Sequence, residues 1–216
     1  MSNLPHLYEV KVKEYLSKLS AGEAPPVDDE LIDLACADFR AALVKQFSRE
    51  GRQKFTVRMS NAGKAKCQLW WQKNSPEKAK KPSYDFIMKM LLGDVIEVLA
   101  LLLMRGAGIP VESYHGKVTL DLKGTDSING EYDVVLDGKV WDVKSSSPFA
   151  FEHKFKDFET LRADDPFGYM AQGFGYAKAS GLPFGGWIVI NKSTGEWKFV
   201  EADNKYSKEY TDVIQD

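Results

Sequence analysis

The sequence has little cysteine and little histidine. Its 216 residues include two cysteines, Cys36 and Cys67, and three scattered histidines, His6, His115 and His153. This spacing supplies neither the four-thiolate pattern of an iron–sulfur cluster nor the Cys/His pattern of a zinc site. We therefore expect a reducing compartment, no disulfide framework and no iron–sulfur cluster.

The sequence also lacks a long hydrophobic run free of charge. Its most apolar stretch, Phe86 to Met104, is interrupted by Lys89, Asp94 and Glu97. We expect this stretch to form a buried helix rather than a membrane span. A basic segment followed by an apolar run does not open the chain, so we expect no signal peptide. The expected location is the cytoplasm, or the host cytoplasm if the protein is viral, with no membrane partner.

Neither sign of charge dominates, since 29 Lys and Arg residues oppose 31 Asp and Glu residues. The basic residues nevertheless gather between Arg49 and Pro82, a segment that contains ten of them and two acidic residues, Glu50 and Glu77. One interpretation is a solvated loop whose tryptophans, Trp70 and Trp71, dock on the core. The other is a surface that binds nucleic-acid phosphates through lysine and arginine.

Hydrophobic periodicity and turn residues predict the order of the secondary-structure elements. The predicted helices are 8–19, 28–49, 84–105 and 167–180. The predicted strands are 117–122, a hairpin over 130–145, and a second hairpin of 186–191 and 196–201, with 148–165 irregular or partly helical. This order predicts a single α/β domain with an N-terminal helical extension.

The hairpin over 130–145 carries the most informative pattern. Asp137-Gly138 is a strong signal for a two-residue turn, which places Asp133 opposite Asp142. Their Cβ atoms would then lie roughly 5 Å apart on one face, with Lys144 two residues further along that face. Because directly opposed like charges are destabilising, a divalent cation would offset the repulsion. The opposite face is predicted to be a core face formed by Tyr132, Val134, Leu136, Trp141 and Val143.

Two of the candidate residues have alternative interpretations. Lys144 would stand opposite Glu131, so it could form an ordinary solvent-facing salt bridge instead of serving a site. Glu97 could share a narrow wet side of its helix with Lys89 and Asp94, or it could point into the metal site. An unpaired carboxylate buried on that apolar helix would be costly without a cation.

Four short motifs follow one another along the chain. They are Gly93-x-x-x-Glu97, Gly130-x-x-Asp133, Asp142-Val143-Lys144 and Gln172-x-x-x-Tyr176, the last pair sharing one helix face. Over roughly residues 84–201 this order resembles the PD-(D/E)XK nuclease superfamily, in its RecB/Cas4-like or phage exonuclease branch. The chain departs from the pattern where Tyr132 replaces the proline before the first aspartate. It also has aspartate at position 142, where glutamate is commoner.

The resemblance implies a restriction-endonuclease-like core, a mixed central β-sheet flanked by helices. This core would span residues 84–216, and residues 1–83 would form a helical and basic extension packed on it. The implied cofactor is Mg²⁺ or Mn²⁺, which also suits an all-oxygen ligand set. The implied metal ligands are Glu97, Asp133, Asp142 and the backbone carbonyl of Val143. The implied catalytic residues are Glu97, Asp133, Asp142, Lys144 and Gln172. The expected DNA contacts are Arg58, Lys64, Lys66, Ser145, Ser146, Lys154 and Tyr176.

The activity implied by the resemblance is metal-dependent hydrolysis of DNA, foremost by an exonuclease of DNA processing, replication or recombination. Its partners would be double-stranded ends or single strands, and a recombination or annealing protein. Three alternatives stay open: a structure-specific endonuclease, a non-catalytic DNA-binding module with the same fold, and a small-molecule-binding α/β protein. The sequence does not specify the oligomeric state.

Overall fold

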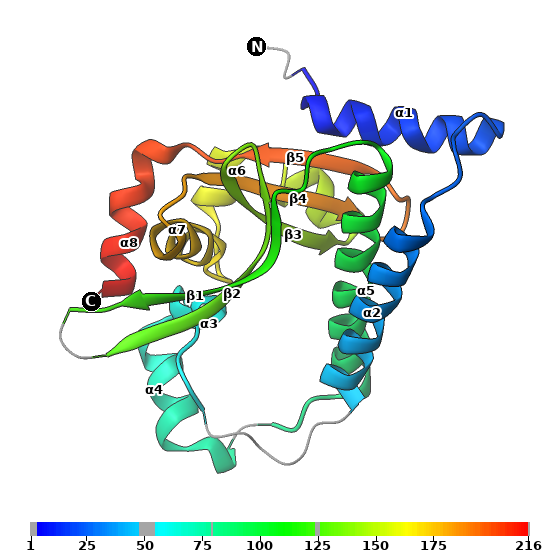
Figure 1. Cartoon of the computed structure of the whole chain (residues 1–216). Coiled ribbons are helices and arrows are strands. Elements are labelled where there is room, and N and C mark those ends of the chain that lie inside the picture. Colours follow the sequence, from blue (N-terminus) through cyan, green and yellow to red (C-terminus); the bar gives the residue numbers. More distant parts are fainter. Residues whose placement is uncertain (1–3, 48–54, 79, 124–125, 216) are drawn as a thin grey trace.

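A computed structural model describes residues 4–47, 55–78, 80–123 and 126–215. The fold is α/β, with a five-stranded mixed sheet flanked by helices (Figure 1), as predicted at this level. Adjacent strands run antiparallel except for the third and fourth, which are parallel. In sheet order the strands are β1 (Ser113–Asp121), β2 (Ser127–Leu136), β3 (Lys139–Ser146), β4 (Phe184–Asn191) and β5 (Trp197–Glu201).

The β2–β3 hairpin has the predicted register. Val134 pairs with Trp141 and Val135 with Val140. Asp137 and Gly138 both have positive φ, 49° and 64°, as a two-residue type I′ turn requires. One further pair in the same register sets Asp133 opposite Asp142, so the hairpin brings the two acids to neighbouring strands.

One face of the sheet is covered by α1 (Leu7–Ala21) and α5 (Tyr84–Gly106). Buried side chains of both helices pack on the sheet face that presents Val134, Leu136 and Trp141. Burial of this apolar surface is the main source of stability for the layer. Among the described helices, α5 included, we find none with the length and apolar character that crossing a membrane requires.

Tyr132 departs from the predicted core face. It packs with the cluster on the opposite side of the sheet, which contains Val135 and Tyr176. Gly116 on β1 explains the difference: a Cβ there would lie 2.0 Å from the Tyr132 ring. The ring therefore lies across the neighbouring strand at a position without a side chain, and its hydroxyl lies 3.1 Å from Ser113 Oγ.

The other face is covered mainly by α7 (Tyr169–Ser180), with α8 (Ser207–Gln215) packed on α7. Aromatic rings fill this layer, including the fully buried Phe174, Phe184 and Trp187. The segment expected to be partly helical contains a π-helical turn over Ala150–Lys154 and α6 (Phe158–Ala163). The sequence reasoning did not predict α8.

The N-terminal part contributes α2 (Asp29–Phe47), which packs along α5, and a helical basic segment. That segment forms α3 (Met59–Ala62), α4 (Lys66–Asn74) and a 3-10 turn over Pro76–Lys78, so the loop interpretation is wrong for these residues. The predicted docking of Trp70 and Trp71 on the core is also wrong, because both side chains are exposed. Residues 48–54, where the predicted second helix would end, and residue 79 lie outside the described residues.

Candidate active site

An ion pair between Asp142 and Lys144 lies at the centre of the candidate site. The Lys144 Nζ is 2.6 Å from Asp142 Oδ2, and Asp142 is only 2% exposed. Within the described chain, Asp142 Oδ1 has no hydrogen-bond partner. The alternative pairing of Lys144 with Glu131 is not what the structure has, because Glu131 lies beside His115 instead.

Asp133 joins this pair from the neighbouring strand. Its Oδ2 accepts a hydrogen bond from the backbone N–H of Val143 at 2.6 Å. The Asp133 side chain therefore accepts a hydrogen bond from β3 at the residue that follows Asp142. This contact lies next to Val134 and Trp141, the backbone pair of the hairpin furthest from the turn. This bond fixes the first acid against the backbone segment that carries the second acid and the lysine.

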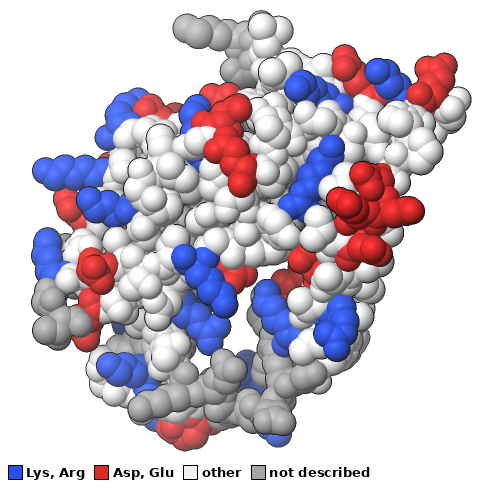
Figure 2. Space-filling view, viewed as in Figure 1, with Lys and Arg blue, Asp and Glu red and all other residues white. Residues whose placement is uncertain are grey.

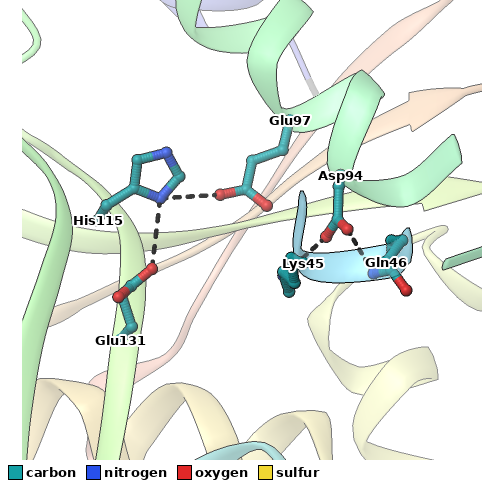
Figure 3. Close-up of polar contacts among 6 residues, drawn as sticks. All are labelled: Lys45, Gln46, Asp94, Glu97, His115 and Glu131. Atoms are coloured by element: carbon teal, nitrogen blue, oxygen red, sulfur yellow. Dashed lines mark hydrogen bonds and ion pairs between the residues drawn. The ribbon is translucent and has the colours of Figure 1, made fainter. Parts of the chain in front are cut away.

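Glu97 reaches the same region from α5. Its Oε1 lies 3.4 Å from Nδ1 of His115, and the same nitrogen is 3.7 Å from Glu131 Oε1 (Figure 3). His115 stands on β1 between residues paired with Val134 and Tyr132, and so opposite Asp133. Its backbone has a positive φ of 51°, a conformation that costs energy for any residue except glycine.

Sequence reasoning missed His115, because three scattered histidines form no ligand pattern. Only the register of β1 against β2 could have found it, and nothing in the sequence marks that register. The predicted strand also began at Lys117, two residues beyond His115, whereas β1 begins at Ser113.

The wet-side interpretation of Glu97 does not describe the helix. Asp94 faces α2, where its carboxylate contacts Lys45 Nζ at 2.9 Å and Gln46 Nε2 at 2.6 Å (Figure 3). Lys89 pairs with Asp85 on the exposed side of the helix. Three polar residues of α5 thus have three environments, and Glu97 is the one turned toward the acids of the hairpin.

The buried acids are electrostatically linked. Burial raises the pKa of Glu97 to about 7, and the negative charges of Asp142 and Asp94 add to the effect. Burial, followed by the charges of Glu97 and Asp142, raises the pKa of Asp133 well above its usual range. Burial also raises the pKa of Asp142, although Lys144 opposes the change.

Lys144 responds in the opposite direction. Burial disfavours its charged form, but the charges of Asp142 and Asp133 outweigh this and raise its pKa above the ordinary value. One cation therefore faces three carboxylates, and the cluster carries an excess of negative charge whenever the acids ionise. Such a cluster is electrostatically suited to a divalent cation.

Glu97 and Asp133 border a cleft with a volume of about 1210 Å³. Its walls come from α2, α5, β1, β2 and the segment before α3, and Glu97, His115, Asp133 and Tyr176 line it. Figure 2 shows this face hollowed at its lower centre, with lysine and arginine atoms around the hollow and acidic atoms within it. The cleft therefore combines a basic rim with an acidic interior.

Gln172 and Tyr176 meet on α7, as their spacing predicts. The Gln172 side-chain amide donates to the Tyr176 hydroxyl at 3.3 Å. Tyr176 is buried, and its ring occupies the space beside Gly130, where a Cβ would lie 2.6 Å from it. The glycine of the second motif thus makes room for the tyrosine of the fourth, at the wall of the cleft.

The predicted DNA contacts differ in their surroundings. Arg58 lines the cleft, Lys66 is exposed and Lys64 is half-buried. Ser145 lies near α5, since a Cβ at Gly93 would be 3.8 Å from its Oγ. Ser146 is buried and donates its hydroxyl to the Ile190 carbonyl.

Lys154 is held by its own neighbours. Its Nζ lies 4.0 Å from Asp164 Oδ2 and 4.9 Å from the centre of the Phe167 ring. These contacts fix the side chain on the segment between β3 and α7. No described contact joins it to the acids of the cleft.

The carboxylates of the candidate site are the expected ligands of a divalent cation. In the ranges that the structure describes, no three His, Cys, Asp or Glu side chains converge closely enough to hold a metal ion. Asp133, Asp142 and Glu97 each turn to a separate partner, namely the Val143 N–H, Lys144 and His115. Their oxygens, one of them buried without a hydrogen bond, are nevertheless the type of ligand that Mg²⁺ and Mn²⁺ prefer.

The comparisons with known proteins give similarity at the level of structure. No family model matches the chain, and no curated protein matches it in sequence. Among solved structures, the crystal structure of SSO0001 is similar, with a TM-score of 0.46 and 11% sequence identity. The alignment covers 84% of this chain and 85% of that one.

Proposed function

We propose that this protein is a metal-dependent deoxyribonuclease, foremost an exonuclease, with a restriction-endonuclease-like core in residues 84–216. The observation that supports this most strongly is the set of Asp133, Asp142 and Lys144 on one hairpin, in which Asp142 is buried and the other two are half-buried. Glu97 stands close enough for its charge to raise the pKa of Asp133. The arrangement has the residue types and the order of elements of the nuclease superfamily that the sequence resembles.

The cost of this cluster favours catalysis over a structural role. Taking charges out of water is expensive, and apolar residues of similar size would often stabilise a core better than a buried ion pair. Titratable groups with perturbed pKa values in a cleft are typical of functional sites. A non-catalytic DNA-binding module would have no use for three acids and a lysine in this position.

The residues that would hold the cation are Glu97, Asp133, Asp142 and the carbonyl of Val143. The chemistry that Mg²⁺ or Mn²⁺ would supply there is polarisation of the phosphodiester and a lowered pKa of water. Lys144 keeps a positive charge beside the acids, so it would orient the attacking water and stabilise charge that develops on the phosphate.

Other residues in and around the cleft would position the DNA backbone. Gln172 and Tyr176 form one polar pair at the wall, and Ser145 follows Lys144 directly on β3. Arg58 lines the cleft, and Lys66 begins α4 further along the same basic segment. Both would pair with phosphates. We leave Ser146 out of this surface because its hydroxyl is buried and already donates to Ile190.

The proposal is tested by digestion of linear DNA labelled at one end. The purified chain is incubated with the DNA in Mg²⁺, in Mn²⁺ or in chelator, and fragments are followed over time. We expect metal-dependent loss of full-length DNA and none in chelator. DNA that stays intact with both ions would contradict the proposed activity and would favour the non-catalytic module.

A further inference from the structure

Two adjacent tryptophans on α4 are unusual for their exposure. Trp70 is 56% exposed and Trp71 is 53% exposed, whereas the other three tryptophans of the chain, at positions 141, 187 and 197, are at most 4% exposed. An indole ring left in water contributes little to folding, because burial of its large apolar surface is what would stabilise the chain. These two rings are therefore available to a binding partner.

The two rings present differently oriented surfaces. Their centroids are 5.1 Å apart and their planes are nearly perpendicular, at 89°. The Nζ of Lys78 lies 5.2 Å from the centre of the Trp71 ring. A planar group stacked at this pair would therefore have a positive charge within reach.

The charge around the tryptophans is almost entirely positive. The helix sequence KCQLWWQKN contains no acid, and Glu77 is the only acidic residue from position 55 to position 78. The basic residues of the same stretch are Arg58, Lys64, Lys66, Lys73 and Lys78. Aromatic rings beside such cations are the combination with which proteins bind single-stranded nucleic acid.

The position of α4 connects the tryptophans to the cleft. Thr56, Arg58 and Ser60, just ahead of α4 in the chain, line the cleft. Met59 between them is fully buried and anchors α3 beside β2 and α7. Figure 1 shows α4 extending from α3, across the molecule from α2 and α5. A strand that leaves the cleft along this segment would reach α4.

We propose that Trp70 and Trp71 form a stacking site for unpaired bases, so that the DNA held beside the cleft is single-stranded. This inference rests on the proposed function for the identity of the polymer. In a duplex the base faces are already covered by their neighbours, so only an unpaired base offers a free face to an indole ring. The lysines around the rings would hold the phosphates of the same strand.

The test measures binding without cleavage, in chelator, on the full chain. Labelled oligothymidine and a blunt duplex of equal length are titrated with wild type, with W70L/W71L and with W70F/W71F. Leucine keeps apolar bulk without a π-face, and phenylalanine keeps the π-face. Because both positions are exposed, we expect all three proteins to fold alike, which circular dichroism checks.

We expect W70L/W71L to lose affinity for oligothymidine by at least about tenfold. This loss lies near the lower end of what one base stacked on an aromatic side chain contributes to binding. W70F/W71F should stay within about threefold of wild type, and duplex affinity should change little in either variant. Binding of oligothymidine should also lower the tryptophan fluorescence of the wild type, whose other three tryptophans are buried.

Three results would overturn the stacking site. They are wild-type affinity in W70L/W71L, an equal loss for duplex and single strand, or a wild type that does not bind oligothymidine. The outcome is separable from that of the cleavage assay. If the protein cleaves DNA but W70L/W71L binds oligothymidine as tightly as wild type, only the stacking site is refuted. If W70L/W71L weakens oligothymidine binding but the wild type never cleaves DNA, only the nuclease activity is refuted.

Discussion

At the scale of single residues, the candidate site is held together by direct contacts of Lys144 with Asp142 and of Asp133 with the Val143 N–H. The turn at Asp137-Gly138 fixed the register, and so Asp133 and Asp142 were predictable as neighbours. The contact of Lys144 with Asp142 rather than Glu131 depends on which side chain is buried, and strand alternation alone does not decide that. The position of His115 depends on how β1 pairs with β2 across a connection without a comparable turn signal.

Replacement of Lys144 by alanine should abolish cleavage while DNA binding changes little. The lysine touches the acid cluster, and removal of one preorganised charge from an active site lowers rates by about 10²–10³-fold. Single-turnover cleavage in Mn²⁺ and binding in chelator measure the two effects separately. Cleavage within a few-fold of wild type would show that Lys144 has no catalytic role.

Replacement of Asp133 by asparagine should weaken Mn²⁺ binding by at least about tenfold, equivalent to about 1.4 kcal/mol. The amide oxygen of asparagine can still accept from the Val143 N–H, so the hairpin should be preserved. Isothermal titration calorimetry measures the affinity, and a thermal unfolding curve in chelator checks the fold. An unchanged Mn²⁺ affinity would remove Asp133 from the set of ligands.

The raised pKa of Glu97 predicts a pH dependence of stability without metal. Between its ordinary value of 4.5 and about 7, the folded chain keeps the proton that the unfolded chain has lost. The stabilisation from this proton is full below pH 4.5 and is lost as the pH rises through 7. E97Q should therefore be more stable than wild type at pH 8, by about 2–3 kcal/mol, and similar to it at pH 4.5.

Urea unfolding in chelator at both pH values measures this difference. The exposed Glu14 on α1 provides the control, because E14Q should show no such change between the two pH values. If E97Q and wild type differ equally at pH 4.5 and pH 8, Glu97 is not held in a proton-binding environment.

At the scale of elements, helices with a clear apolar stripe and strands with a clear turn were predictable. The long helix α5 was predicted at its first residue and to within one residue of its last, since Gly106 and Pro110 follow its apolar pattern. The basic segment was harder, because the nine-residue α4 buries none of its side chains and so has no clear apolar stripe. Its fold also depends on Met59, which is anchored between β2 and α7. The short C-terminal α8 has no strong signal before it and was missed.

Neutralisation of four lysines in the basic segment should flatten the salt dependence of DNA binding. Each phosphate contact that is lost lowers the slope of log affinity against log salt by about 0.7–0.9. The variant replaces Lys64, Lys66, Lys80 and Lys81 by glutamine, and its affinity is measured over a series of salt concentrations. An unaltered slope would remove the basic segment from the DNA surface.

The control for this experiment keeps the change in net charge but moves it elsewhere. It replaces four exposed lysines outside the segment, namely Lys18, Lys178, Lys192 and Lys208. We expect the control to retain most of the wild-type slope. Equal flattening in both variants would indicate a general charge effect rather than a local surface.

At the scale of the whole molecule, the order of elements predicted the α/β class, and the family resemblance implied the mixed sheet. The cleft was not predictable, because α2 is distant in sequence from its other walls, α5, β1 and β2, and meets them only through tertiary packing. One such contact joins α2 to α5, where Lys45 and Gln46 of α2 donate hydrogen bonds to the carboxylate of Asp94. The candidate residues were thus visible in short motifs, but the cleft beside them was not.

The most direct test of a metal-dependent exonuclease compares one DNA in two forms, linear duplex and covalently closed circle, incubated with the protein and Mn²⁺. We predict progressive loss of the linear form from its ends, none in chelator, and a circle that stays closed. Nicking or cutting of the circle would replace the exonuclease by a structure-specific endonuclease. Both forms intact at every time point would contradict the assignment of Asp133, Asp142 and Lys144 to a nuclease site.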